Sequence, residues 1–123
     1  MASYFISPPD ETDWSLAPEE FEARLRERWP DAEIRPAPEE SPMAFHFTID
    51  VGGEALDGAY AADGQTLWIE MASEEEMAEL AVWFRGQVPE DEALDFADEG
   101  LEVELPLDPS ITPEQFLERF AAA

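Results

Sequence analysis

The sequence of 123 residues contains no cysteine, no lysine and no asparagine, and its only histidine is His46. Without cysteine, the chain can form no disulfide, no thiol nucleophile and no thiolate metal site. No apolar run approaches the ~20 residues of a transmembrane helix, and the N-terminus lacks the basic and long apolar segments of a signal peptide. These features predict a cytoplasmic protein.

Positive charge is scarce, because six arginines stand against 31 acidic residues and the formal net charge is −25. A protein that binds nucleic acid needs cationic side chains to replace the counterions of the phosphates, and an anionic membrane surface repels a protein of this charge. We therefore expect no nucleic acid and no membrane among its partners. The charge favours a basic protein as the partner.

The excess charge is informative only where it clusters. A folded chain of this size has a surface of about 6,600 Å², on which the net charges would lie roughly 16 Å apart if they were spread evenly. Since the Debye length is ~8 Å at physiological salt, an even spread is largely screened and is explained by solubility, coding bias or salt adaptation.

Residues 90–104 are the clearest local cluster, with eight carboxylates and no basic residue. Within them, Glu99, Glu102 and Glu104 are candidates for contacts with a basic partner. The alternative interpretation is a solvated loop followed by an edge strand that charge protects from aggregation.

Three helices are expected from their start signals. Pro18 precedes two glutamates, which is typical of a first helical turn, and the apolar residues after it recur at helical spacing. Ser73 and Thr112 each have a Glu or Gln three residues later, which is the pattern of a capping box. The 45% apolar content is sufficient for a core, and the length favours a single domain, 1–123.

The segment from about 44 to 71 predicts a meander of three antiparallel strands. Apolar and polar residues alternate from Phe45 to Val51, and Gly52-Gly53 and Asp63-Gly64 are typical of tight turns. The two turns set registers that place the apolar residues on one common face. The predicted pairs are Ile49–Leu56, Phe47–Gly58 and Phe45–Tyr60 across the first turn, and Leu56–Met71, Gly58–Ile69 and Tyr60–Leu67 across the second.

The expected fold is of the α+β class, a mostly antiparallel sheet of five to six strands with the meander at its centre and three helices packed mainly on one face. Further strands are expected at 3–7, at 32–35 and from Leu101 to Leu105, the last with Glu102 and Glu104 on its outer face. The helix after the meander is expected to return that last strand parallel to a neighbouring strand.

The registers also predict the composition of the opposite face of the meander. His46, Ala59 and Trp68 form one row, in which Trp68 is either covered by the first strand or the 36–42 connector, or available to a partner. Asp57 and Glu70 are predicted to face each other. Because like charges are unfavourable there, either a cation or basic side chain lies between them or both side chains turn into water.

Signals for catalysis are poor. The sequence has no Gly-rich phosphate loop and no Gly-x-Ser-x-Gly motif, and no spacing ties a serine to His46. His46 could act as a general base or as one metal ligand, but a half-exposed strand histidine without a special role is the simpler interpretation. We therefore expect no catalytic residue, no metal and no cofactor.

The leading hypothesis is a non-catalytic acidic protein that binds a basic protein partner. Small acidic inhibitors of nucleases, such as bacterial immunity proteins, act through this physics, although the likeness is one of size and charge and no motif carries it. The candidate contact residues are Trp68, His46, Asp57, Glu70, Glu99, Glu102 and Glu104.

Two alternatives stay open. One is a small enzyme or ligand-binding domain with a pocket between helices and sheet, near His46 or Glu70. The other is a self-associating domain, a homodimer that uses the Trp68 face or an edge strand.

Overall fold

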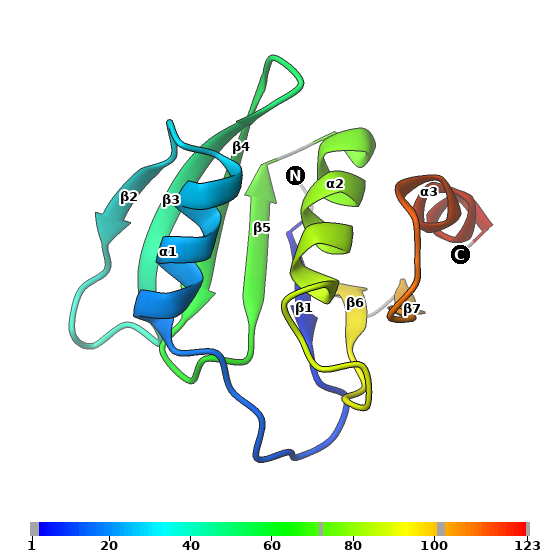
Figure 1. Cartoon of the computed structure of the whole chain (residues 1–123), viewed down its shortest axis with the longest axis horizontal. Helices are drawn as coiled ribbons and strands as arrows, with labels where there is room; N and C mark the ends of the chain where they lie inside the picture. Colours follow the sequence, from blue (N-terminus) through cyan, green and yellow to red (C-terminus); the bar gives the residue numbers. More distant parts are fainter. Residues whose placement is uncertain (1–2, 72, 101–102, 123) are drawn as a thin grey trace.

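The computed structural model describes residues 3–71, 73–100 and 103–122. It is an α+β fold with three helices packed on a seven-stranded antiparallel sheet (Figure 1). The strands are β1 (Tyr4–Ser7), β2 (Glu33–Pro36), β3 (Met43–Val51), β4 (Glu54–Ala61), β5 (Leu67–Met71), β6 (Asp95–Asp98) and β7 (Glu104–Pro106), and the helices are α1 (Pro18–Arg28), α2 (Glu74–Arg85) and α3 (Pro113–Ala122). None of these helices is long and apolar enough to cross a membrane, as judged over the described residues.

The strand order is β2-β3-β4-β5-β1-β6-β7, so the predicted meander forms one half of the sheet. The pairs between β3 and β4 match the prediction, with Phe47 opposite Gly58. Gly52 and Gly53 connect the two strands at φ angles of 62° and 92°, which glycine adopts without steric cost. Gly58 lies opposite Ile69 of β5, also as predicted.

The β4–β5 pairing departs from the prediction at a bulge. Beyond Gly58 the register shifts by one residue, and Asp57 pairs with Met71. The predicted Leu56–Met71 pair is therefore wrong. A bulge places two residues of one strand opposite a single residue of its partner, whereas the predicted register assumed one residue opposite each residue.

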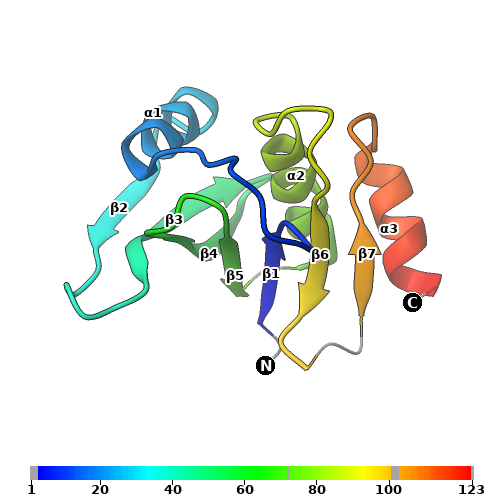
Figure 2. The ribbon, with the colours of Figure 1, turned by 90° about the horizontal axis from the view of Figure 1, so that it is seen from below.

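The helices α1 and α2 both bury apolar residues against the sheet, and those of α1 recur at the helical spacing noted in the sequence. Phe21 of α1 is fully buried and stacks on Tyr60 of β4, with ring centroids 4.0 Å apart. The helix ends where the backbone N–H of Trp29 bonds to the carbonyl of Leu25. At the start of α2, Ser73 and Glu76 form the predicted capping box. Figure 2 shows α1 and α2 along the same side of the strands.

The third helix, α3, completes this layer at the β6–β7 end of the sheet. Its predicted capping box forms, because the N–H of Gln115 donates to the hydroxyl of Thr112 at 3.2 Å and the N–H of Thr112 donates to the Gln115 side chain at 3.0 Å. Phe116 is fully buried against Phe96 of β6, with ring centroids 4.9 Å apart. The three helices therefore cover one face of the sheet, as expected.

Strand β6 was not predicted, and it raises the strand count to seven. It pairs antiparallel with both β1 and β7, so the expectation that the strand after α2 runs parallel to a neighbour is wrong. The physical reason is that β1 occupies the position between β5 and β6. The expected strand from Leu101 to Leu105 is reduced to β7, and Leu101 and Glu102 lie outside the described residues.

Arg85, at the end of α2, is buried with 2% of its surface exposed. Its Nη2 donates to the carbonyl oxygens of Pro89, Glu90 and Glu92, at 3.3, 3.4 and 3.0 Å. Burial lowers its pKa, while Asp108 and Glu90 act in the opposite direction. The arginine thus holds the turn between α2 and β6 against the helix.

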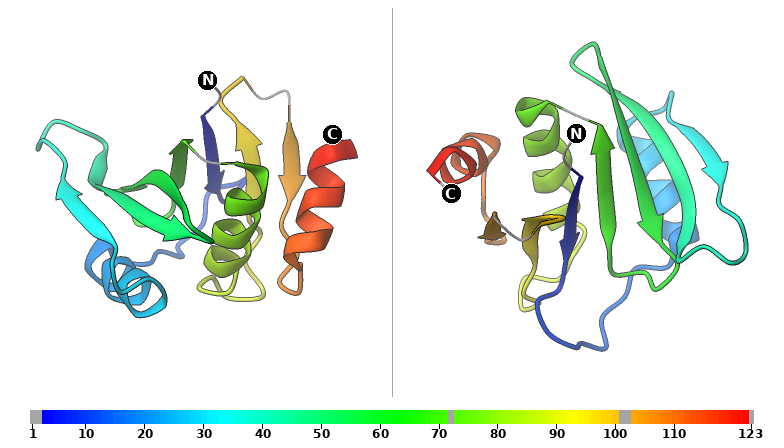
Figure 3. Two further views of the ribbon diagram at one scale, coloured as in Figure 1. Left: turned by 90° about the horizontal axis from the view of Figure 1, so that it is seen from above. Right: turned by 180° about the vertical axis from the view of Figure 1, so that it is seen from behind.

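The reverse side of the sheet carries none of the described helices. Seen from behind, in the right-hand view of Figure 3, strands β3, β4 and β5 lie in front of α1. Side chains alternate along each strand, so the residues between the core positions point to this side. The functional candidates of the meander lie there.

Candidate functional site

One row of paired residues crosses the helix-free side of the sheet from edge to edge. Because neighbouring strands lie ~4.8 Å apart, the row is about 29 Å long. In strand order its members are Arg35, His46, Ala59, Trp68, Phe5, Ala97 and Glu104. We use the term open face for this row together with Thr48, Asp57, Glu70 and Asp95, which lie beside it on the same side.

The centre of the open face is an aromatic pair. Phe5 of β1 lies opposite Trp68 of β5, their ring centroids are 5.0 Å apart, and both side chains are half-buried. Ala59 and Ala97, the row members on either side, are only 1% and 3% exposed. The structure confirms one of the two predicted coverings of Trp68, namely that by the first strand, and the cover leaves part of the indole accessible.

His46 and Glu70 lie together beside this aromatic pair. The Nδ1 atom of His46 is 3.8 Å from Oε1 of Glu70, and both side chains are partly exposed. Arg35 is the cross-strand neighbour of His46 on the edge strand β2. The structure therefore brings His46, Trp68 and Glu70 into one area, as the sequence predicts.

Asp57 does not face Glu70, which corrects the prediction. The bulge makes Glu70 the extra residue of β5 and places Asp57 opposite Met71. Asp57 instead accepts a hydrogen bond of 2.7 Å from the hydroxyl of Thr48. Each carboxylate thus has its own neighbour, and the repulsive pair that required a cation between them is absent.

Carboxylates gather again at the far end of the row. Glu104 is exposed on the edge strand β7. Three strand spacings separate it from Trp68, which is a distance of about 14 Å. Burial, and then the nearby Glu104 and Asp10, raise the pKa of Asp95. Glu99 lies in the turn between β6 and β7, off the row, and Glu102 lies outside the described residues.

The open face offers an imidazole, carboxylates and aromatic rings as its chemical groups. In the part of the chain that the structure describes, no three His, Asp or Glu side chains are grouped so that they could hold a metal ion. The hypothesis of a ligand pocket placed His46 or Glu70 beside it. A cavity of about 740 Å³ does exist between α1 and α2, but neither residue lines it.

Sequence reasoning did not place the aromatic Phe5 or the charged Arg35 and Asp95 on the open face. Phe5 precedes the buried Ile6 in a predicted strand, so the sequence could predict that its side chain points to the face opposite that of Ile6. Its position beside Trp68 could not be predicted from the sequence, because Phe5 and Trp68 are more than sixty residues apart and no tight turn links β1 to β5.

Comparisons of the chain with protein-family models, with curated proteins and with solved structures found no match. The geometry of the site is therefore the basis for the functional proposal.

Proposed function

We propose that the protein is a non-catalytic interaction protein that binds a basic protein partner through its open face. The observation that carries the proposal is the half-buried Phe5–Trp68 pair at the centre of a sheet face without a helix. Binding hot spots are enriched in tryptophan and lie near the centre of an interface, inside a more polar rim. We place this interaction in the cytoplasm, an expectation from the cysteine-free composition.

The charges of the open face support a basic partner. Asp57, Glu70, Asp95 and Glu104 surround the aromatic pair, against a single arginine, Arg35. Burial, and then repulsion by Glu104 and Asp10, raise the pKa of Asp95, and a partner's lysine or arginine would offset the repulsion. The net charge of −25 would also accelerate the encounter with a cationic protein, and salt would reduce this acceleration.

A second copy of the chain fits the open face less well than a basic protein. It would bring the same excess of carboxylates against those already there. The edge strands β2 and β7 are short and end in Pro36 and Pro106, which donate no N–H to a pairing strand. Charge and edge chemistry thus favour a partner of opposite charge over a homodimer.

Affinity capture followed by a titration tests the proposal. The tagged protein is exposed to an extract of its source organism at low and at high salt, and retained proteins are identified by mass spectrometry. A basic protein retained only at low salt is then purified, and its dissociation constant is measured calorimetrically. Trp68→Ala should weaken binding by about tenfold or more, because it removes the aromatic centre. Trp14→Ala, at a half-buried tryptophan outside the open face, should change it little.

Paired charge reversals give a second readout. Glu70→Lys with Glu104→Lys should slow association at low salt, since both carboxylates lie on the open face. Glu114→Lys with Glu118→Lys changes the net charge equally at exposed positions of α3. Equal effects of the two pairs, or retention of no basic protein, would refute the proposal.

A further inference from the structure

The only histidine of the chain, His46, lies on the open face, in the same row of paired residues as Trp68. Histidine is the side chain that ordinarily changes its charge between pH 5 and 8, whereas carboxylates and arginine ordinarily keep theirs. The chain has no cysteine, which is the next side chain to titrate above this range. A change of pH near neutrality therefore acts on the proposed binding surface at one known position.

The charged groups near His46 come from β2, β4 and β5, as judged over the part of the chain that the structure describes. Arg35 lies opposite His46 on β2, and it is 3.8 Å from its own carboxylate partner, Glu33. Asp57 lies diagonally across on β4, one pair further along. Glu70 of β5 is in direct reach, because its Oε1 is 3.8 Å from Nδ1 of His46. Protonated His46 thus forms an ion pair with Glu70.

Protonation of His46 has two consequences for a cationic partner, and both oppose binding. It adds a positive charge to the row that contains Trp68. It also forms the ion pair with Glu70, which then offers less negative charge to the partner. Both side chains are partly exposed, with 37% and 48% of their surfaces accessible, so a protein on the open face contacts them directly.

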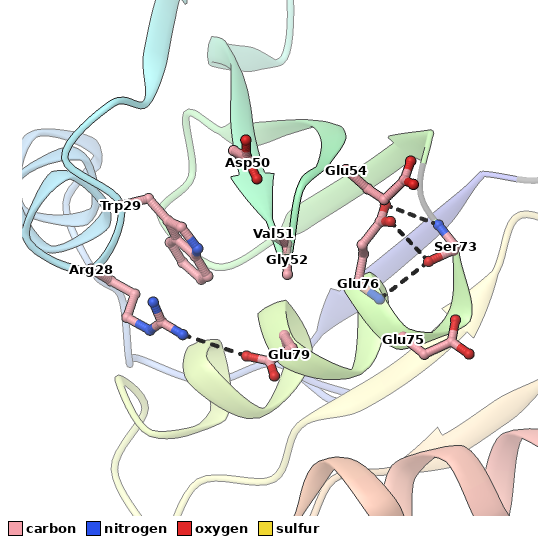
Figure 4. Close-up of a pocket in the computed structure, with 10 residues that line it drawn as sticks. All are labelled: Arg28, Trp29, Asp50, Val51, Gly52, Glu54, Ser73, Glu75, Glu76 and Glu79. Carbon is pink, nitrogen blue, oxygen red and sulfur yellow. Dashed lines mark hydrogen bonds and ion pairs between the residues drawn. The ribbon is translucent and has the colours of Figure 1, made fainter.

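The cavity between α1 and α2 does not share this property (Figure 4). Its lining contains carboxylates and one arginine but no histidine. Arg28 is paired with Glu79, at 3.4 Å between Nη2 and Oε2. Glu54 and Glu75 point away from Trp29. A response to pH near neutrality is therefore expected at the open face and not at this cavity.

We propose that protonation of His46 weakens the binding of a basic partner at the open face as the pH falls from 8 to 5.5. This inference rests on the function proposed above and adds its regulation. One unit charge acts in solvent at about the distance of a direct contact, so the affinity should fall about fivefold. The partner is held more tightly at neutral pH than in a mildly acidic medium.

Nuclear magnetic resonance tests the inference with a defined cationic probe. The probe is N-acetyl-hexalysine amide, whose charge is constant from pH 8 to 5.5. Its dissociation constant is measured from the indole N–H signal of Trp68 and should rise about fivefold over this range. His46→Gln should nearly abolish the rise, and His46→Thr, which suits a strand, replaces it if that variant does not fold. The same pH dependence in the variant and the natural chain would overturn the inference.

Asp95 is the second group of the open face to consider in this titration. Burial, and then the nearby Glu104 and Asp10, raise the pKa of Asp95, so this carboxyl takes up a proton at a higher pH than an ordinary aspartate. Asp95→Asn should nevertheless keep the pH dependence measured at Trp68. Its loss in this variant would assign the response to Asp95 and overturn the role of His46.

A matched pair of variants tests the part played by Glu70. Glu70→Gln should weaken binding of the probe at pH 8 and reduce the pH dependence, because the carboxylate that protonated His46 would engage is absent. Glu114→Gln, at an exposed position of α3, removes the same charge and should leave the pH dependence unchanged. Equal pH profiles of the two variants would contradict the ion pair between His46 and Glu70.

The inference and the proposed function fail in different ways. A Trp68 signal that the probe shifts with the same dissociation constant at both pH values would overturn the regulation alone. A Trp68 signal that the probe does not shift at either pH would mean that the open face binds no cation, and both would then be refuted.

Discussion

The two faces of the meander carry aromatic side chains in different surroundings. Phe47 of β3 is fully buried beneath α1, where it lies 6.0 Å from the ring of Phe21. Trp68 of β5 points to the other side, is half-buried and has Phe5 as its aromatic neighbour. The alternation of the strands explains both orientations, but burial in the core explains only the first. Core packing does not explain an indole on a face without a helix, and the partner binding proposed above is one explanation.

The largest effect that tests this contrast is the loss of Phe47. Phe47→Ala should lower the free energy of unfolding by about 3–5 kcal/mol, because it leaves a cavity in the core. Trp68→Ala should lower it by about 1–2 kcal/mol, since the indole is only half-buried. Urea denaturation followed by circular dichroism measures both. If Phe47→Ala does not fold, Phe47→Leu keeps the comparison measurable. Equal losses would mean that the open face is stabilised like the core.

A smaller loss is expected from Gly58→Ala, at the strand between these two aromatic residues. A Cβ atom there would lie 2.5 Å from Cζ of Phe47 and 2.8 Å from the backbone oxygen of Trp68. The backbone oxygen cannot move aside as a side chain can, so the variant should lose about 1–3 kcal/mol. The double variant Gly58→Ala with Phe47→Leu should therefore be less stable than Phe47→Leu alone. An unchanged denaturation midpoint in the single variant would contradict the close packing.

The smallest effect concerns the acidic end of the open face. Because the folded state raises the pKa of Asp95, its protonated form stabilises the fold. That contribution is fully present below the ordinary pKa of 3.8 and is lost as the pH rises through the value in the folded protein. Asp95→Asn should therefore stabilise the protein at pH 7, by an amount that shrinks as the pH falls toward 3.8.

Denaturation midpoints from pH 3 to 8 measure this difference. Asp91→Asn, at an exposed residue, controls for the removal of one negative charge. A stability gain of Asp95→Asn that does not vary with pH, or one matched by the control, would argue against repulsion and burial at this position.

The sequence was informative where structure depends on neighbours along the chain. The Gly52-Gly53 turn sets the pairing of Phe47 with Gly58, and Ser73 begins α2, because turns and caps depend on a few adjacent residues. The bulge at Asp57 was not predictable from an alternating pattern. Neither was β6, whose four residues begin and end with aspartate and which exists as a strand through its pairing with β1 and β7.

In the candidate sites, too, the predictable features depend on nearby residues and the others on long-range pairing. The positions of His46 and Trp68 follow from the hairpin turns, but Phe5 reaches Trp68 only through the pairing of β1 with β5. The cavity between α1 and α2 is lined by three segments that meet only in the folded chain. Arg85 also gave no sign of its burial, since its acceptors are carbonyl oxygens, which no side-chain pattern encodes.

The central place of β1 has a consequence for the order of events during synthesis. Its two neighbours, β5 and β6, are respectively more than sixty and about ninety residues further along the chain. A ribosome therefore releases residues 4–7 long before either neighbour exists, while the hairpin of β3 and β4 can form as soon as it emerges. Contacts of such long range are slow to form. The first strand to be translated can therefore pair on both sides only after the last third of the chain has been synthesised.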